Sequence, residues 1–591
     1  MSQTAGFGAR RKPGSLLTAA VVALLLGGGL LLTGCGGSLA RTPRMSDAWS
    51  KGLPLGLASL NNRTGLAVEK GGSVCVVWVG QERDLRFVRL DDRAHVEIDR
   101  ALDLETNRPQ QPLLALDGEG YLHLTWLDTL ADGLQLFYAR LSPDGETLQN
   151  ATVLSSSPLE ASRTAMAIDP LGGTVEVFWS DMSPSRSGLY HAALDGVGTI
   201  VLPQELLIPD GLWPAAQIDN QGFVHLAWQT KDLTGATSYH YAVYDLQDRA
   251  LGPSMVVLEP GLEPGLLGRP TARGRFDGPW LGLEDDFVYL TWVLEVREQG
   301  SLSAFTFYQA FPLPPLQRPV AASGFTYPLP QVTAPPVHVQ GADPTVTGDP
   351  VFLPGRPARQ ALAFYTLAQG PRNQEMLQSG VVELQGGQVL GQEVVSATSA
   401  ASLKPAVAAD GQGYLHLVWI DTAGFNRYQV VYASTAPQAQ EVLNRVTAGE
   451  VLDSVLSFGM GAVSLFALAP LALLWVLPPF VMLVFYFLAT QQSDLEGRRS
   501  YVVLAVAILV LTAIQVGTTA GVTEGALGST LPSAMRGLSW LIPLLTSGVA
   551  VGVMLLSLRR TDHRTIFGGF LVYAAVNVLL FALVYLVPAV M

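Results

Sequence analysis

One phrase recurs along the first three quarters of this chain, and its period constrains the fold more than any other feature. The phrase ADGQGYLHLVWID at 409–421 returns as ALDGEGYLHLTWLD at 115–128, AIDPLGGTVEVFWSD at 167–181 and QIDNQGFVHLAWQT at 217–230. Looser copies surround Trp78 and Trp292, and the run RQALAFYT places Phe364 or Tyr365 where the tryptophan is expected. Fixed-period repeats of this length are typical of solenoids, propellers and arrays.

The spacing of the tryptophans gives the number of units. The tryptophans of the repeated phrase at 78, 126, 179, 228 and 292 lie 48, 53, 49 and 64 residues apart. The further 127 residues to Trp419 leave room for two units, one of them degenerate, so we expect seven. Each unit holds short runs that alternate apolar and polar residues between Gly, Asp and Pro, which is typical of strands joined by turns. The repeat therefore predicts an all-β propeller of seven four-stranded blades.

The residues shared by the units have structural explanations. The aspartates are predicted to accept hydrogen bonds from backbone N–H groups in tight turns: Asp117, Asp169, Asp219 and Asp410. The tryptophans are predicted to fill the core between sheets: Trp78, Trp126, Trp179, Trp228, Trp292 and Trp419. A calcium site would need more oxygen ligands than any unit gathers. Since His123, His225 and His416 occupy equivalent places in different units, they would lie around a ring, and no metal or cofactor is expected.

The pattern P-x-x-A-x-D-x-x-G-x-x-H-x-x-W-x-D resembles the repeats of sialidase-like, Asp-box-type propellers over roughly residues 51–446. The hallmark of that family, S-x-D-x-G-x-x-W, is reduced here to SPDGETL at 142–148. Catalytic members use an arginine triad, a Tyr/Glu pair, an acidic general acid and an early Arg-Ile-Pro signature, which this chain lacks. Arginines are available for an anion site by abundance alone: Arg269, Arg273, Arg275, Arg356 and Arg359. The resemblance therefore implies the fold, and no residue is predicted to be catalytic.

The N-terminus has the features of an export signal. Residues 1–35 hold a basic patch and then an apolar run rich in small residues, as in secretory signals. The run ends in LTGC, which resembles the lipobox of bacterial lipoproteins, in which the cysteine is diacylated. The resemblance implies lipidation at Cys35, followed by a linker at 36–50; an uncleaved signal anchor is the alternative. Either way, the propeller is expected outside the cytoplasm.

Residues 447–591 are predicted to form a transmembrane domain. Thr447 and Glu450 form a capping-box pattern directly before an apolar run. Four segments are long and apolar enough to cross a bilayer: about 458–489, 501–522, 537–558 and 566–590. The first and third connections are rich in arginine, so the positive-inside rule places both in the cytoplasm, with the propeller and the C-terminus outside.

The predicted spans contain no Asp, Glu, Lys, Arg or His, which disfavours a pump or transporter. The polar exceptions, Gln515 and Asn577, are expected to form hydrogen bonds between helices. The spacings Gly517-x-x-x-Gly521 and Gly548-x-x-x-Gly552 would allow close helix contact. These features predict a four-helix bundle that packs with itself or docks another membrane protein.

A proline-rich stretch at 311–339 interrupts the repeats between the fifth and sixth units. Because proline cannot donate a ladder hydrogen bond, we expect a loop or an extended segment on one face of the disc. The stretch could dock a partner in polyproline conformation, or it could be an insertion without function.

Composition limits the possible functions. The net charge of −13 argues against a nucleic-acid partner, since phosphate binding needs a basic face. The favoured hypothesis is a non-catalytic binding or scaffold protein for an envelope polysaccharide, a peptide or a membrane-protein partner, with membrane lipid around its base. The alternative is a surface-anchored sialidase-like glycosidase or lyase, which needs two carboxylates across one pocket; Asp285 and Asp286 are adjacent and would face opposite ways. A sensor that signals through a partner is a third hypothesis.

Overall fold

The structure is a computed structural model, and it describes part of the chain. The described residues are 46–59, 62–232, 235–259, 273–298, 301–316, 325–332, 336–340, 346–369, 375–396, 398–424, 427–446, 475–522, 541–561 and 564–581. The predicted signal with Cys35, the capping box at 447–450 and the first half of the predicted span 458–489 lie outside them. The chain divides into a propeller unit, Pro43–Arg445, and a second unit of Met1–Thr42 and Val446–Met591.

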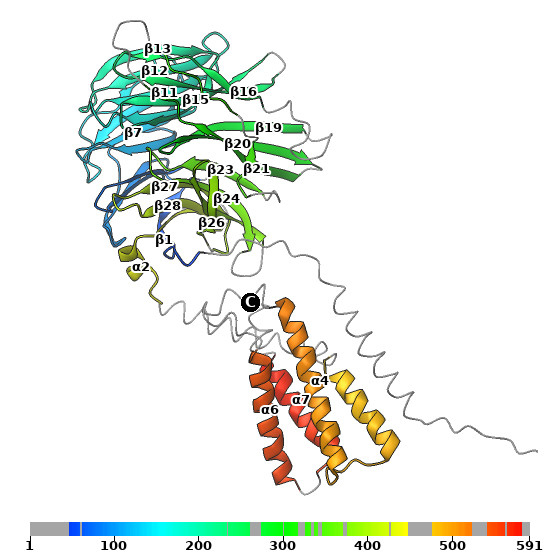
Figure 1. Ribbon diagram of the computed structural model, residues 1–591. Helices are drawn as coiled ribbons and strands as arrows, with labels where there is room; N and C mark the ends of the chain where they lie inside the picture. The colour runs from blue at the N-terminus through cyan, green and yellow to red at the C-terminus, as the bar shows by residue number, and fades with distance from the viewer. Residues whose placement is uncertain are drawn as a thin grey trace, which may run out of the picture. The chain divides into compact units, whose positions relative to one another are not determined.

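The propeller unit holds seven antiparallel sheets, one for each predicted repeat (Figure 1). Blade 1 contains β2 (Gly65–Val68), β3 (Val74–Val79), β4 (Leu85–Leu90) and β5 (Val96–Ala101). Blade 2 contains β6 (Pro109–Leu116), β7 (Leu122–Leu130), β8 (Gly133–Leu141) and β9 (Thr152–Val153). Blade 3 contains β10 (Thr164–Ile168), β11 (Val175–Asp181), β12 (Gly188–Leu194) and β13 (Ile200–Pro209).

The remaining blades follow the same order. Blade 4 contains β14 (Leu212–Ile218), β15 (Phe223–Lys231), β16 (Thr237–Asp245), β17 (Ala250–Leu251) and β18 (Met255–Leu258). Blade 5 contains β19 (Arg273–Leu283), β20 (Phe287–Glu298), β21 (Ser301–Pro312) and β22 (Val337–His338). Blade 6 contains β23 (Thr347–Phe352), β24 (Gln360–Gln369), β25 (Glu375–Gln385) and β26 (Gln388–Val394). The predicted seven-bladed propeller is confirmed.

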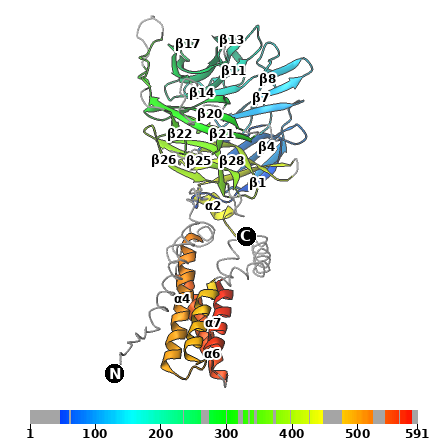
Figure 2. The ribbon, with the colours of Figure 1, turned by 90° about the vertical axis from the view of Figure 1, so that its right-hand side faces the viewer.

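Blade 7 is completed by a strand from the other end of the propeller. It contains β27 (Ser402–Ala409), β28 (Leu415–Thr422), β29 (Tyr428–Ser434) and, as its fourth strand, β1 (Leu53–Ala58). Both ribbon views show β1 in the same sheet as β28, with β29 between them in the pairing order and the short helix α2 (Pro437–Leu443) close by (Figures 1 and 2). Because β1 precedes blade 1 in the chain, its pairing with β29 closes the ring.

The first strands of the blades surround the axis of the propeller. Each first strand contacts the first strands of both neighbouring blades, and these contacts form a full circle: β2, β6, β10, β14, β19, β23 and β27. Side chains on these strands are therefore the ones that can meet at the axis.

The second strand of each blade carries its large aromatic residue into the core. Six of them hold the predicted tryptophans, each at most 3% exposed. In blade 6 the position is taken by Phe364, which is fully buried, whereas Tyr365 is half-buried. In four blades the tryptophan stacks on or faces the ring opposite it on the third strand: Trp126–Phe137, Trp179–Tyr190, Trp228–His240 and Trp292–Phe307. Such aromatic pairs add to the burial of apolar surface between blades.

The described part of the proline-rich stretch packs against the propeller. Phe325 stacks on Phe223 of blade 4 at 5.3 Å. The Tyr327 hydroxyl accepts a hydrogen bond from the Val243 N–H and donates one to the Pro253 carbonyl. The stretch then returns as β22 in blade 5, so these residues seal the outer part of blade 4.

The second unit contains four described helices, drawn side by side in Figure 2. They are Trp475–Thr490, α4 (Arg498–Val522), α6 (Leu541–Arg560) and α7 (Ile566–Phe581). Two stretches are long and apolar enough to cross a membrane, Arg498–Gly517 and Pro543–Arg560. The other two described helices are shorter and apolar.

A polar cluster lies inside this apolar bundle. Gln515 donates to Asn577 at 2.6 Å, so the predicted hydrogen bond between helices is confirmed. The Tyr573 hydroxyl lies 3.0 Å from Thr512 and 2.8 Å from Ser547, which ties α4, α6 and α7 together. In contrast, a Cβ added at Gly517, Gly548 or Gly552 would meet no atom within 4 Å. These glycines therefore make no close helix contact within the described part of the chain.

Candidate ligand-binding site on the propeller axis

The first strands of five blades share a local distortion. In each, the pairing with the second strand is shifted at an X-Pro dipeptide. The residue before the proline has a positive φ, between 49° and 54° where it is not glycine. L-residues rarely adopt this region, and a bulge re-aims the side chain that it carries. The five residues are Gln111, Trp213, Gly278, Asp349 and Lys404.

Two arginines occupy the same place in the other blades. Gln111 lies six residues before the turn residue Asp117, and Arg163 lies six residues before Asp169. Arg63 has the same spacing from an acidic residue in blade 1, and both arginines are followed by threonine where the other blades have proline. Each blade thus places one residue at this level, and we call the set the axial ring: Arg63, Gln111, Arg163, Trp213, Gly278, Asp349 and Lys404.

Contacts between distant blades show that the ring converges. Arg63 of blade 1 lies 3.5 Å from the Asp349 carboxylate of blade 6, and its guanidinium lies 5.5 Å from the Trp280 ring of blade 5. Arg163 of blade 3 pairs with Asp277 of blade 5, which directly precedes Gly278. Blades 1 and 6, 1 and 5, and 3 and 5 are not neighbours, so these side chains meet only because they reach the axis.

Arg163 is the most firmly held member of the ring. Its Nη2 lies 2.9 and 3.2 Å from the two carboxylate oxygens of Asp277. Its guanidinium lies 5.1 Å from the Trp213 ring and 5.0 Å from the Trp280 ring, a cation–π arrangement. Its Nη1 is buried and has no hydrogen-bond partner in the described part of the protein. A fixed guanidinium with an unpartnered buried nitrogen is a prepared donor, since a buried N–H without an acceptor is costly.

Burial and charge work against each other in this site. Burial lowers the pKa of Arg63, and the facing Asp349 only partly compensates. Burial also lowers the pKa of Lys404, against the attraction of Asp349. At Asp277 burial would raise the pKa, but Arg163, the Gly278 N–H and Arg63 outweigh it and hold the pKa below its ordinary value. Three cations therefore face two carboxylates, an excess of one positive charge in a chain of net charge −13.

Comparisons with known proteins give distant structural similarities only. No protein-family model matches the chain, and no curated protein matches it. Among solved structures, an ulvan lyase of polysaccharide lyase family PL25 is 9% identical, with 64% of this chain and 93% of that chain covered and a TM-score of 0.41. The Hadza microbial sialidase Hz136 is 10% identical, with 66% and 95% covered and a TM-score of 0.30. The BP39L lectin from Burkholderia pseudomallei is 14% identical, with 63% and 98% covered and a TM-score of 0.33.

The arginines singled out from the sequence do not gather at the axis. Arg356 lies beside Asp285, with its Nε 3.9 Å from the carboxylate, and Arg359 lies 3.7 Å from Glu383. Arg275 is an exposed residue of β19, Arg269 lies outside the described residues, and the side chain of Arg273 is not described. The arginines of the axial ring, Arg63 and Arg163, were missed because each occurs in a unit without the X-Pro signal. The signal that could have revealed them is their spacing of six residues from the turn.

The shared aspartates lie at the turns, and three of them also face a histidine. In these blades the histidine Nδ1 lies 2.6–2.8 Å from a tyrosine hydroxyl, and Nε2 lies 3.2–3.7 Å from the aspartate. These triads are Asp117–His123–Tyr138, Asp219–His225–Tyr241 and Asp410–His416–Tyr432. Asp169 has no such histidine and accepts hydrogen bonds from the N–H groups of Leu171 and Gly172. The triads lie in separate blades, and the described residues contain no group of His, Cys, Asp or Glu able to hold a metal.

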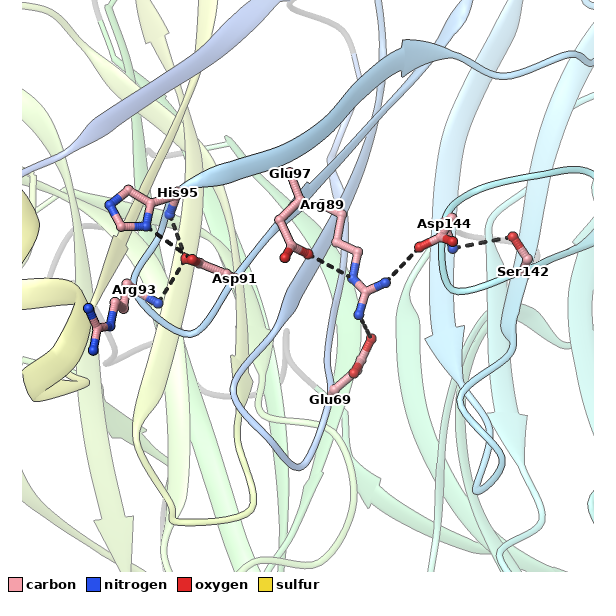
Figure 3. A network of polar contacts seen from close by, with 8 residues as sticks. All are labelled: Glu69, Arg89, Asp91, Arg93, His95, Glu97, Ser142 and Asp144. Atoms are coloured by element: carbon pink, nitrogen blue, oxygen red, sulfur yellow. Dashed lines mark hydrogen bonds and ion pairs between the residues drawn. The ribbon is translucent and has the colours of Figure 1, made fainter.

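The remnant of the Asp-box joins two blades at the rim. Arg89 of blade 1 contacts Glu69, Glu97 and Asp144 of blade 2, and the Ser142 hydroxyl accepts a hydrogen bond from the Asp144 N–H (Figure 3). A shallow depression of about 490 Å³ lies here, lined by Arg89, Glu97, Ile98, Arg100, Asp144 and Glu146. Because the arginines already face carboxylates of this chain, we assign the network to the attachment of blade 1 to blade 2.

Proposed function

We propose that this chain is a membrane-anchored binding or scaffold protein whose ligand site is the axial ring. The observation that carries the proposal is Arg163, which two indole rings and Asp277 hold in place while its Nη1 has no hydrogen-bond partner among the residues that the structure describes. A site prepared in this way binds without first ordering its side chains, which favours affinity.

The chemistry of the ring suits a polar polymer with flat faces. Arg163 and Lys404 supply donors, Asp349 supplies acceptors, and Trp213 and Trp280 supply aromatic surface. A saccharide has both hydroxyl groups and apolar ring faces, and the excess positive charge favours one with acidic groups. We therefore propose an acidic polysaccharide of the cell envelope as the first ligand to test, ahead of a peptide.

The electrostatics favour binding over cleavage. A glycosidase general acid needs a carboxyl whose pKa is raised towards neutrality. At Asp277 the pKa is shifted the other way by Arg163 and the Gly278 N–H, so this carboxylate stays ionised. Asp349 lies beside Arg63 and near Lys404, where it neutralises cations. The alternative, a glycosidase or lyase, would be recognised by shortening of the bound glycan.

The anchor belongs to the same proposal. We propose lipidation at Cys35, a linker at 36–50, and a four-helix transmembrane domain after residue 446. The length and apolar character of Arg498–Gly517 and Pro543–Arg560 support it, as does the arginine in the connections. In this arrangement the propeller and the C-terminus lie outside the cytoplasm of a bacterial cell.

The binding site is tested by glycan-array binding of the purified full-length protein. Arg163→Ala removes the prepared donor, and Trp213→Ala removes one indole face; each is expected to weaken binding of an acidic glycan by at least about tenfold. Arg359→Gln, an exposed arginine away from the ring, serves as the matched control. Unchanged binding by both ring variants would reject the axial site, and shortening of the glycan during incubation would favour the enzyme.

The scaffold part is tested on native membranes. Gentle detergent extraction followed by mass spectrometry is expected to recover envelope or membrane subunits in fixed proportion to this protein. Recovery of the protein alone would reject scaffolding and leave glycan binding as its function.

A further inference from the structure

The two short loops of the helical bundle lie at one end of it and are bonded to each other. The Leu495 N–H donates to the Arg564 carbonyl at 2.9 Å, and the Ile566 N–H donates to the Ser493 carbonyl at 2.8 Å. The loops join Trp475–Thr490 to α4 and α6 to α7, and both ribbon views show them at the same end of the bundle (Figures 1 and 2). The start of α4, the end of α6 and the start of α7 therefore lie close together.

This end of the bundle carries a cluster of exposed arginines, which we call the arginine end. Its members are Arg498, Arg499, Arg559, Arg560 and Arg564. None of them forms an ion pair with another described residue. The described carboxylates nearby are Asp494 and Glu496, while Asp562 and His563 lie outside the described residues. Counted over the sequence of both loops, five arginines stand against three carboxylates, Asp494, Glu496 and Asp562, so this end carries an excess of two positive charges.

The helix dipoles make the arginine end more positive still. The N-terminus of a helix carries a partial positive charge and is stabilised by acidic residues. Neither α4 nor α7 has an acidic residue in its first turn. Instead, Arg498 and Arg499 open α4, and Arg564 lies two residues before α7. Without an external anion, these cations and both dipoles repel one another.

The surface next to the arginines is apolar. Four exposed apolar side chains lie within about one helical turn of these arginines: Tyr501 and Val502 on α4, and Leu555 and Leu556 on α6. An anion that matches both features has a negative head and a hydrocarbon tail. We propose that the arginine end binds the phosphate groups of anionic phospholipids, a proposal that rests on the proposed membrane location of the bundle.

The test uses the full-length protein purified in a mild non-ionic detergent. Native mass spectrometry measures retention of added phosphatidylglycerol and, separately, of phosphatidylcholine. We expect the wild type to retain phosphatidylglycerol at least about tenfold more than phosphatidylcholine. Replacing all five arginines with glutamine should abolish the preference, whereas replacing them with lysine should keep most of it, because lysine also pairs with phosphate. Arg359→Gln with Arg445→Gln controls for the loss of exposed arginines elsewhere.

Several results would overturn the proposal. Equal retention of both lipids by the wild type would do so even if the glutamine variant failed to fold. Full competition by inorganic phosphate would show that the apolar surface is not used, and loss of a co-purified protein subunit with lipid retention unchanged would assign the arginines to a protein partner. Alkaline carbonate extraction of cell membranes tests the proposed membrane location separately. Release of the protein would reject that location, whereas retention of the protein with equal binding of both lipids would reject only the lipid site.

Discussion

At the scale of single residues, the same side-chain type has different roles according to what surrounds it. His416 is 1% exposed and lies between Tyr432 and Asp410. Burial lowers its pKa from 6.5 to about 4, and the attraction of Asp410 only partly opposes this. Burial likewise lowers the pKa of His123 and His225. The propeller therefore holds these histidines neutral at pH values where a free imidazole is charged.

We expect this to make the propeller sensitive to acid. The unfolded chain binds a proton at each histidine as the pH falls through about 6.5, whereas the folded chain does so only near pH 4 at His416. The contribution of the neutral His416 to the free energy of unfolding is therefore fully present above pH 6.5 and is lost as the pH falls from 6.5 to 4. Melting temperatures followed by tryptophan fluorescence should fall over this window, and His416→Gln should make the fall shallower. An equal fall in the variant would exclude His416 as a source of the acid sensitivity.

Gly145, in the remnant of the Asp-box, is predicted to be essential for the contact of blades 1 and 2. Its φ is +70°, and a Cβ there would meet the Phe87 ring at 2.4 Å. Gly145→Ala should lower the free energy of unfolding by about 1–3 kcal/mol through backbone strain and the clash. Gly120→Ala, with φ +91° and no atom within 4 Å, isolates the backbone cost. Urea unfolding of both variants measures the difference, and equal losses would show that the contact with Phe87 contributes nothing.

At the scale of elements, the blades followed from the sequence because each repeats one pattern. The alternation before each tryptophan and the spacing near 50 residues predicted seven sheets, and Phe364 was found at a position already in doubt between two aromatic residues. The segment β1 could not be predicted, because LPLGLA lacks the phrase and its partner β29 lies at the far end of the propeller. The axial ring was not predicted, because the residue type at its position varies from blade to blade. Only arginine occurs there twice, as Arg63 and Arg163, and the proline that follows the position in the five other blades was the one repeated mark.

In the bundle, the hydroxyl group of Tyr573 links three helices. It lies within hydrogen-bond distance of Thr512, Ser547 and Asn577. Tyr573→Phe should destabilise the bundle by about 1 kcal/mol, a typical cost for polar contacts between helices in membranes. Unfolding in mixed SDS and mild-detergent micelles measures it. Tyr501→Phe, on the exposed side of α4, is the matched control, and equal effects of the two changes would deny the hydroxyl a role in the bundle.

At the scale of the whole propeller, the closure of blade 7 brings the two ends of its chain together. The Lys51 N–H donates to Asn444 at 2.7 Å, and the Lys51 Nζ donates to the Arg445 carbonyl at 3.3 Å. The Ser50 N–H donates to the Ser434 carbonyl at 2.8 Å. Since a ring closed by strand pairing has no preferred starting blade, the position of the ends is expected to be exchangeable.

A circular permutant tests this expectation. We join residue 445 to residue 46 by a short glycine linker and open the chain between Leu171, which is 69% exposed, and Gly172. Blade 3 then closes the ring, and the permutant should melt within a few degrees of the unpermuted propeller unit and bind the same ligand. The same permutant without β1 is the control and should melt at a clearly lower temperature. Failure of the complete permutant to fold would mean that closure at blade 7 is specifically required.

The closure also determines how the propeller responds to force. In the antiparallel pair, Leu53 at the start of β1 lies opposite Tyr432 near the end of β29. The two ends of the propeller chain therefore leave the strand pair at the same end of it. Tension between the two ends therefore opens the pair one residue at a time, like a zipper, instead of loading all its hydrogen bonds together in shear. If both proposed anchors hold the chain, force from motion of one anchor against the other acts first on the hydrogen bonds between Ser50 and Ser434. Blade 7 is thus the mechanical weak point of the ring, and the six other blades are shielded until it opens.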